Sequence, residues 1–284
     1  MSRSRRRRSI FRSSIPQDTR RVDLHMHSKL SDGRLSCEEI LMEASKKKLD
    51  IICVSDHDLA PSLEARVYSD YGHDVRVIHG AEMSVELAGE EQHFLAYFPS
   101  SMPVGFRNIC REAAKARAVR YDMICDELSL EGVRRADMQA KKGLRSLTRL
   151  HLARAIVDAG HARTISEAFD RWLRKMEGVE HFPDVVLMIQ QIKDYGGVCI
   201  WAHPSIKKAS FHVSRLKKEG LDGLEVFRPY VKKGEKKRLR MLCSTYKMLC
   251  SGGSDSHGDS MGLFSFPAQE IHDWPTSFSF HNSQ

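Results

Sequence analysis

The sequence predicts an α/β fold in which a mainly parallel sheet, open or closed into a barrel, is interrupted by a helical insertion. Short apolar runs rich in β-branched residues alternate with segments of helical periodicity at both ends of the chain, as in β–α units joined by short links. The middle of the chain has helical periodicity and almost no strand signal. Polar clusters follow the expected strands, where parallel α/β folds place their active sites.

Two β–α units and a hairpin are expected before the insertion. Ser36 and Glu39 form the pattern of a capping box, which predicts that a helix begins there and runs to Lys48. A second helix is expected from about Pro61. The strands of this part are expected at 22–27, 50–54, 75–78, 83–87 and 92–98, and the last two flank a short loop with Gly89, as in a β-hairpin.

The alternation of strands and helices returns after the insertion. Helices are expected near 183–195, 211–219 and 232–246, and strands at 197–201, 223–227 and 248–250. We therefore divide the chain into a disordered basic tail (1–20), a first part of the α/β domain (21–101), the helical insertion (102–178) and a second part of the α/β domain (179–284). The insertion is expected to act as a lid or substrate subdomain.

The composition indicates a globular protein, and we expect it in the cytoplasm. Hydrophobic residues make up 41% and charged residues 29% of the 284 positions, and no apolar run is long enough to span a membrane. The arginine-rich start lacks the apolar core of a secretory signal. The seven cysteines are odd in number and never spaced as C-x-x-C, so reduced thiols fit better than disulfides or a thiolate zinc site.

The charge balance favours phosphate-bearing partners. The formal net charge is +8, and the run from Arg5 to Arg8 contributes four of these charges. This run is equally consistent with a solvated tail and with a tail that contacts nucleic acid. No pattern in the sequence indicates a protein partner.

Histidines and carboxylates follow nearly every expected strand. His25 and His27 are two positions apart on a strand, so both project to the same side. Taken singly, such residues have structural explanations: His93 as a half-exposed strand residue, Asp32 as a turn former, Asp255 as a loop cap. Together they point to metal binding, because a fold has no structural reason to place them all on one side. The candidate ligands are His25, His27, Asp32, His57, Glu82, His93, His203, Asp255 and His257.

Imidazole and carboxylate ligands without thiolates suit zinc, manganese or iron, with magnesium as a further option. Nine candidates exceed what one ion needs. With about three or four protein ligands per catalytic ion, they provide for two or three divalent ions. Clustered ions are suited to hydrolysis of phosphate esters, because they activate water and neutralise the charge on the phosphoryl group.

Six ordered motifs carry a resemblance to a known family. VDLHMHSKLSDG, VSDHD, HGAEMS, HFLAYF, WAHP and GGSDSHG resemble the motifs of the polymerase and histidinol phosphatase (PHP) family. The resemblance covers roughly 21–99 and 182–263. Residues 148–155 also resemble the inserted helical segment of the PHP subgroup that hydrolyses nucleotide 3′-phosphates and trims short RNAs from the 5′ end, although Leu150 stands where that subgroup usually has proline.

The resemblance implies a distorted seven-stranded β/α barrel of PHP type with a trinuclear metal site. It implies that a first metal is held by His25, His27, Glu82 and Asp255. A second metal would be held by Glu82 as a bridge, with His93 and His203, and a third by Asp32, His57 and His257. Asp56 and Asp58 flank a ligand and are expected to orient it, since metal-bound imidazoles usually donate their other N–H to a carboxylate or carbonyl.

Two residues of the insertion are candidates for substrate contact, and with Asp58 they complete the predicted catalytic set. Arg149 can grip a phosphate in bidentate fashion, and a lid helix would bring it and His151 over the metals. An ordinary solvated basic helix face explains these two residues equally well. Arg145, Arg154 and Arg228 are further, weaker candidates.

These observations favour a metal-dependent phosphoesterase that acts on a nucleotide or a short oligonucleotide. The main alternative substrate is a small phosphorylated metabolite such as histidinol phosphate. Hydrolysis of C–N amide bonds is a different enzyme class, and it would need a site for an uncharged carbonyl rather than basic groups. A third alternative is a non-catalytic RNA-binding protein that keeps the metals for stability.

Overall fold

The computed structural model describes residues 18–138, 145–174, 182–258, 264–271 and 273–278. The predicted basic tail therefore lies outside the described residues up to position 17. None of the described helices combines the length and the apolar character that crossing a membrane requires.

Two mixed sheets of five strands form the centre of the molecule. The first sheet has the order β10-β1-β2-β4-β3 and the second has the order β5-β6-β7-β8-β9. The strands of the first sheet are β1 (Arg21–Met26), β2 (Ile51–Val54), β3 (Val67–Tyr68), β4 (Val75–Val77) and β10 (Phe266–Pro267). Those of the second are β5 (His79–Leu87), β6 (Glu90–Phe98), β7 (Val198–Trp201), β8 (Gly223–Phe227) and β9 (Leu249–Gly252).

Parallel pairing occupies one part of each sheet. In the first sheet β1, β2 and β4 are parallel, and the short strands β3 and β10 add antiparallel edges. In the second sheet β7, β8 and β9 are parallel, while β5, β6 and β7 pair antiparallel. The predicted α/β class is confirmed, and the predicted hairpin is the β5–β6 pair.

The predicted seven-stranded barrel is not present as a closed sheet in the described residues. In the part of the chain that the structure describes, the β-bridges that connect the two sheets are isolated ones, at Met26 with Ser256 and at His57 with Glu82. The reason is visible after β9, where the chain leaves the strand and runs past β1 as a loop. Two backbone hydrogen bonds hold it there, from Asp255 N–H to His25 O (2.8 Å) and from His27 N–H to Ser256 O (2.9 Å).

The prediction of a helix from about Pro61 is wrong. Residues 59–66 form no helix, and the segment is instead drawn into the first sheet as β3. The backbone N–H of Val77 donates to Arg66 O at 2.9 Å, which pairs this segment with β4. Strand β3 is only two residues long, too short to give a periodic signal.

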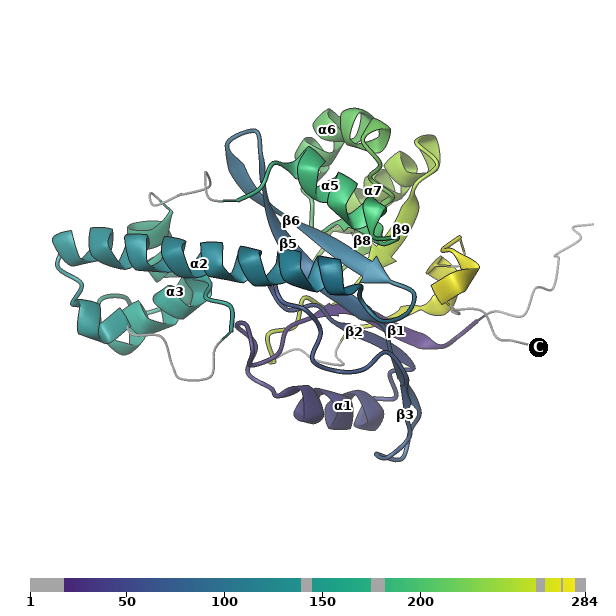
Figure 1. Cartoon of the computed structure of the whole chain (residues 1–284), viewed down its shortest axis with the longest axis horizontal. Helices are drawn as coiled ribbons and strands as arrows, with labels where there is room; N and C mark the ends of the chain where they lie inside the picture. The colour runs from purple at the N-terminus through teal and green to yellow at the C-terminus, as the bar shows by residue number, and fades with distance from the viewer. Residues whose placement is uncertain (1–17, 139–144, 175–181, 259–263, 272, 279–284) are drawn as a thin grey trace, which may run out of the picture.

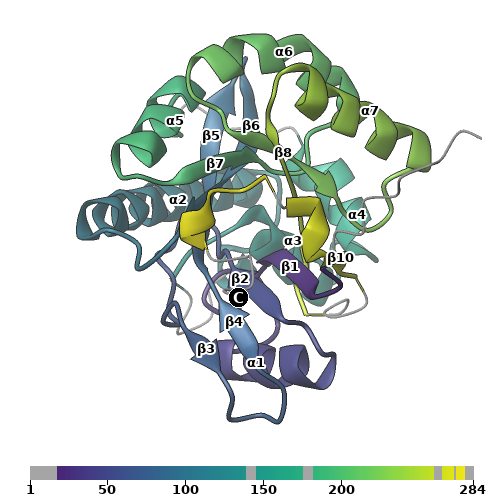
Figure 2. The same cartoon turned by 90° about the vertical axis from the view of Figure 1, so that its right-hand side faces the viewer.

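Helices cover the outer faces of both sheets. Helix α1 (Cys37–Lys46) has the predicted capping box, with the Ser36 hydroxyl accepting from Glu39 N–H and the Glu39 carboxylate accepting from Ser36 N–H. It lies beside the first sheet (Figure 1), and its Ile40 and Leu41 pack with Ile52 in a satellite core. Helices α5 (Val185–Asp194), α6 (Ile206–Lys218) and α7 (Lys233–Thr245) form an outer layer over the second sheet (Figure 2).

The described part of the insertion consists of helices joined by turns and short loops, without a strand. It comprises α2 (Val104–Leu130), a 3₁₀ turn (Arg135–Met138), α3 (Arg149–Asp158), α4 (Ile165–Ala168) and a π-helical turn (Phe169–Leu173). Leu128, Leu152 and Ile156 belong to a hydrophobic cluster of its own. Near its start, α2 buries Phe106 in the core shared by both sheets. One long helix therefore joins the insertion to the sheets (Figure 1).

Candidate metal centre

The backbone brings all nine candidate ligands to one place. His25 lies on β1, Glu82 on β5 and His93 on β6, while the others lie in the loops that follow β1, β2, β7 and β9. The ligand atoms of eight of the nine candidates fall into overlapping groups, and Glu82 belongs to more than one of these groups. The ninth, His203, contacts Glu82. The loops after β1 and β2 of the first sheet thus meet the β5–β6 hairpin and the loops after β7 and β9 of the second sheet.

The first group has the spacing of a tetrahedral site. Its atoms are His25 Nε2, His27 Nε2, Glu82 Oε2 and Asp255 Oδ1. Glu82 Oε2 lies 3.2 Å from each of the two imidazole nitrogens, which are 3.3 Å apart. Asp255 Oδ1 lies 3.4 Å from His25 Nε2 and 3.2 Å from His27 Nε2. Ligands about 2.0–2.1 Å from a tetrahedral ion lie about 3.3–3.4 Å apart, so the spacing fits.

The second group uses the other oxygen of the same carboxylate. Glu82 Oε1 lies 2.9 Å from His203 Nε2 and 3.1 Å from His93 Nδ1, and these two nitrogens are 3.3 Å apart. His57 Nδ1 approaches from the other side, 3.1 Å from Glu82 Oε2. Glu82 Oε2 therefore faces the first group and His57, while Glu82 Oε1 faces His93 and His203. A carboxylate so placed could bridge two ions.

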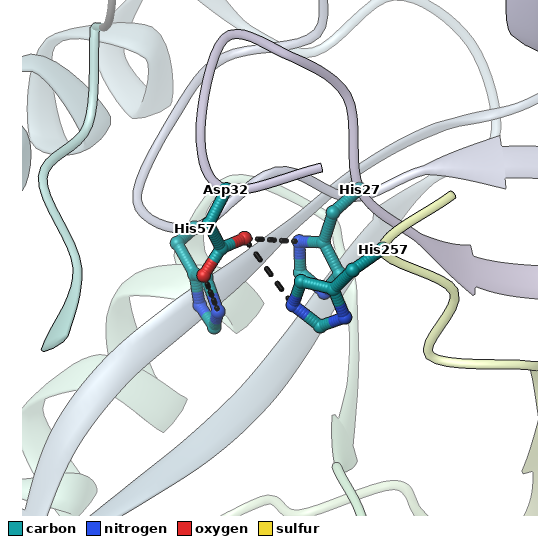
Figure 3. A group of neighbouring side chains, drawn as sticks. All are labelled: His27, Asp32, His57 and His257. Atoms are coloured by element: carbon teal, nitrogen blue, oxygen red, sulfur yellow. Dashed lines mark ion pairs between the residues drawn. The ribbon is translucent and has the colours of Figure 1, made fainter. Parts of the chain in front are cut away.

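The third group is more open (Figure 3). Asp32 Oδ1 lies 3.3 Å from His257 Nε2 and 3.8 Å from His27 Nδ1, and Asp32 Oδ2 lies 3.6 Å from His57 Nε2. His27 and His57 thus each face two groups, one with each ring nitrogen. The resemblance implied that each of these histidines binds one metal. In the structure His27 also faces the third group, and His57 also faces the second group.

Several buried ligand atoms lack hydrogen bonds. Glu82 Oε2, His27 Nδ1, His57 Nδ1 and Asp32 Oδ1 are fully buried and form no hydrogen bond with the described residues. A buried polar atom without a partner costs roughly 1–3 kcal/mol, and four in one cluster would be a large penalty. Divalent cations would complete the coordination of these atoms. The residues therefore fit the metal ions that their chemistry implies.

The carboxylates of the cluster raise the pKa of two imidazoles, whereas burial holds the pKa of His57 well below its usual value. Burial alone lowers the pKa of His27, but the Asp255, Glu82 and Asp32 carboxylates overcome it and raise this pKa to about 10. Burial likewise opposes protonation of His93, and Glu82 and Glu91 raise its pKa to about 9. For Glu82, burial opposes ionisation, yet the neighbouring imidazoles hold its pKa well below the usual range. Buried carboxylates at this density need cations beside them.

Metal binding is therefore expected to release protons. With pKa values of about 10 and about 9, His27 and His93 are protonated at neutral pH in the metal-free protein, and they must lose these protons to become ligands. The apparent affinity for Mn²⁺ or Zn²⁺ should rise as the pH increases from about 6 to about 9. Calorimetric titration in buffers of different ionisation enthalpy measures the protons released. Binding without proton release, at an affinity independent of pH, would contradict this prediction.

Glu225 orients two of the candidate ligands, and sequence reasoning missed it. Its Oε1 accepts from His25 Nδ1 at 3.0 Å, and its Oε2 accepts from the backbone N–H of His203 at 2.8 Å. The proton held on Nδ1 leaves His25 Nε2 free to coordinate a metal. The available signal was a carboxylate inside the fully buried strand GLEVF, because buried charges need partners.

The two aspartates beside His57 face away from the ligand groups. Asp58 accepts from the backbone N–H of Ser84 at 2.8 Å and forms a short ion pair with Arg117. Asp56 accepts from the backbone N–H and hydroxyl of Ser28 and from the Ser31 hydroxyl, which fixes the loop that carries Asp32. Among the described residues neither aspartate hydrogen-bonds to His57, so the expectation that they orient its imidazole is not confirmed. A catalytic role for Asp58 stays a prediction.

The start of α3 lies against the third group. His151 Nδ1 accepts from the backbone N–H of Thr148 at 3.1 Å, and burial lowers the pKa of this imidazole. Arg154 donates to the backbone O of Asp32 at 2.8 Å. The N–H of Arg145 bonds to Leu30 O at 2.9 Å, which ties the same loop to the insertion. The predicted substrate role of His151 is therefore accompanied by a structural one, as a helix cap.

A pocket of about 240 Å³ opens beside the second group. His93 and His203 contribute to its lining together with Arg149, Lys208 and Ser205, which suit an anion, and with Gln92 and the Glu91 carboxylate. Arg149 Nη2 lies 2.7 Å from Glu91 Oε2. Arg228 lies outside this pocket and donates to Pro204 O at 3.2 Å. A phosphate placed in the pocket would reach both the second ligand group and the basic side chains.

Comparison with known proteins agrees with this geometry. The PHP domain model matches residues 23–179. The 5′-3′ exoribonuclease of Haemophilus influenzae is 26% identical over 248 residues, covering 84% of this chain and 90% of that protein. The 3′,5′-nucleoside bisphosphate phosphatase of Chromobacterium violaceum is 24% identical over 253 residues, covering 85% and 88%.

One solved structure with the same fold comes from Bifidobacterium adolescentis and carries an assignment as a metal-dependent phosphoesterase. It aligns with a TM-score of 0.72 at 23% identity, covering 90% of this chain and 96% of that one. A structure from Chromobacterium violaceum described as an amidohydrolase with bound sulfate also aligns with a TM-score of 0.72, at 20% identity over 84% of this chain and 88% of that one. At these identities the likeness concerns the fold.

Proposed function

The chain belongs to the PHP domain family, and from this premise we propose that it is a metal-dependent phosphoesterase acting on nucleotides or short oligonucleotides. One observation carries the proposal: Glu82 divides its two oxygens between two ligand groups, beside a pocket lined by Arg149 and Lys208. An uncharged amide substrate has no use for these cationic side chains, whereas a phosphate ester does.

The ligand groups would hold two or three divalent ions, with manganese, iron and zinc as the metals that suit the donor set best. When bound, such ions activate water, hold phosphoryl oxygens and neutralise the leaving oxygen. The chain itself supplies the arrangement. Glu82 fixes the spacing of the first two groups, Glu225 sets the tautomer of His25, and Arg149 and His151 are the proposed contacts to the substrate.

Metal analysis followed by a substrate panel tests this function. The metal content of the purified protein is measured first, and phosphate release is then followed with 3′,5′-bisphosphate nucleotides, mononucleotides, short RNAs and histidinol phosphate. Preference for a nucleotide or an RNA end is the expected result. If the protein hydrolysed histidinol phosphate alone, its substrate would be a small phosphorylated metabolite rather than a nucleotide or an RNA. A metal-loaded protein that hydrolyses none of these esters would refute the enzymatic proposal.

Replacing Arg149 with alanine tests the nucleotide specificity. A guanidinium that grips a second phosphate contributes roughly 1.5 to 3 kcal/mol, so kcat/KM for a 3′,5′-bisphosphate nucleotide or an RNA 5′ end should fall by about 10- to 100-fold. An aryl phosphate, which has only the reacting phosphate, should lose much less.

Arg163→Ala is the matched control, since Arg163 is an exposed arginine at the start of α4 in the same insertion. It should leave both substrates unaffected. An equal loss for both substrates in Arg149→Ala would assign Arg149 to the reacting phosphate or to the fold. If the activity on both substrates were unchanged, Arg149 would have no role in binding the substrate.

A further inference from the structure

Glu91 sits where the ligand cluster meets the insertion. It lies on β6 two positions before His93, so both side chains project from the same face of the strand. Its carboxylate Oε1 lies 3.3 Å from His93 Nε2, and its Oε2 lies 2.7 Å from Arg149 Nη2 and 3.0 Å from Arg120 Nη1. Its side chain is only 8% exposed. One buried carboxylate thus contacts a candidate metal ligand and two arginines of the insertion closely, with a third, Arg117, at 3.8 Å.

We propose that Glu91 is a positioning residue that couples the second ligand group to the anion-binding arginine of the insertion. The half of the proposal that concerns Arg149 rests on the proposed function. The half that concerns His93 does not, because it involves only ligand geometry.

On the ligand side, Glu91 selects the tautomer of His93. His93 offers Nδ1 to the second group, 3.1 Å from Glu82 Oε1, and this nitrogen is free to coordinate only when the ring proton sits on Nε2. Donation from Nε2 to Glu91 holds the proton there. This is the arrangement by which a carboxylate orients a metal-bound imidazole, and removing such a partner costs about 10- to 100-fold in metal affinity.

On the insertion side, Glu91 balances an excess of positive charge. Arg117 has Asp58 as its nearer partner and lies 3.8 Å from Glu91 Oε1, whereas Arg120 and Arg149 depend on Glu91 as their counter-charge. Arg120 is 4% exposed, and its Nε and Nη2 form no hydrogen bond with the described residues. Without Glu91, two neighbouring guanidinium groups would repel each other in a desolvated place. Arg149, at 27% exposure, is the one free to move away from the pocket.

The adjacent glutamate lacks these contacts, although it shares the hairpin and the charge. Glu90 has an exposed side chain that pairs with Lys208, and it projects from the opposite face of β6. Glu90→Gln therefore removes one carboxylate from the same hairpin without removing a partner of His93 or Arg149.

The first experiment measures metal affinity and needs no turnover. Mn²⁺ or Zn²⁺ is titrated calorimetrically into metal-free wild type, Glu91→Gln and Glu90→Gln. In Glu91→Gln, we expect the affinity of the ion held by the second group to fall by about 10- to 100-fold, and we expect Glu90→Gln to match wild type. Equal metal affinities in wild type and Glu91→Gln would overturn the role of Glu91 in orienting His93.

The second experiment measures selectivity at saturating metal. Glu91→Gln should raise KM for a 3′,5′-bisphosphate nucleotide more than KM for an aryl phosphate, because Arg149 is displaced. Adding Arg149→Ala to Glu91→Gln should cost no further selectivity, because the two residues act as one unit. Losses of selectivity that multiply in the double variant would overturn the coupling.

A third variant covers the case in which Glu91→Gln does not fold because of its unbalanced arginines. Glu91→Gln with Arg120→Met removes one cation along with the carboxylate, and the same two measurements apply to it against Arg120→Met alone. If the wild type hydrolyses no phosphate ester, the proposed function fails, and the metal titration alone decides on Glu91. If the wild type is active and selective and Glu91→Gln is unchanged in both measurements, this inference fails and the function stands.

Discussion

Replacing Glu82 with glutamine is expected to abolish tight metal binding and to lower turnover by about 100- to 1,000-fold or more. The two oxygens of Glu82 lie 3.2 Å from His27 Nε2 and 2.9 Å from His203 Nε2, in different ligand groups. An amide keeps one oxygen but loses the negative charge, and its nitrogen does not coordinate. The first and second groups would both lose a ligand, and the imidazolium charges around them would lose their nearest counter-charge.

Glu86→Gln is the control for this substitution. Glu86 lies on the same strand, opposite Glu91, and its carboxylate accepts from the backbone N–H of Gly89 at the turn of the hairpin rather than contacting a candidate ligand. Metal content and phosphate release are measured on both variants after the same purification. A Glu82→Gln protein with a wild-type metal count and full activity would show that Glu82 bridges nothing.

Replacing Arg117 with methionine is expected to lower the free energy of unfolding by about 3–5 kcal/mol, the cost of breaking a buried ion pair from one side. Arg117 donates to Asp58 and to the Ser84 hydroxyl, and the paired side chains are 4% and 1% exposed. Methionine fills similar space but leaves the Asp58 carboxylate buried without its cation. Since Asp58 directly follows His57, the loss would also disturb that imidazole.

Chemical denaturation measures this effect, with Lys115→Met as the matched control. Lys115 lies two residues earlier on α2, in an exposed pair with Glu112, and such pairs contribute about 0–1 kcal/mol. The double variant Arg117→Met with Asp58→Asn should recover part of the loss, because no unpaired charge remains. A destabilisation of Arg117→Met no larger than that of Lys115→Met would show that this ion pair does not hold α2 against the sheets.

The strands and the gathering of the ligands were predictable from the sequence, because both follow from local patterns. Alternation and β-branched runs located the hairpin and the parallel strands, and the rule that loops at strand ends meet located His57, His203 and Asp255. The missed strands β3 and β10 have two residues each, which is too few for any period to show. The segment after Pro61 does not form the expected helix, because it pairs with β4. This tertiary contact cannot be predicted from local propensity.

The finer arrangement of the site depends on contacts between residues distant in sequence. Glu225 contacts His25, 200 positions away in the sequence, and Arg117 contacts Asp58, 59 positions away. No rule of motif spacing predicts such pairs. The resemblance allotted each imidazole to one metal. In the structure His27 and His57 each turn one ring nitrogen to one group and the other nitrogen to another. Motif spacing names the residue but says nothing about which of its nitrogens faces which neighbour.

Because the two sheets are not joined into one closed sheet, the candidate ligands could also have a structural role. His25 and His57 come from the first sheet, Glu82 and His93 from the second, and only isolated backbone bridges join the sheets at this seam. A cation shared by such ligands would act as a cross-link, comparable to a disulfide that ties two halves of a molecule together. Because it binds only the folded form, an ion at 100 times its dissociation constant adds about 2.7 kcal/mol. Architecture and chemistry would then depend partly on the same few atoms, so that losing the metal would remove one cross-link between the sheets and leave their shared hydrophobic core to hold them.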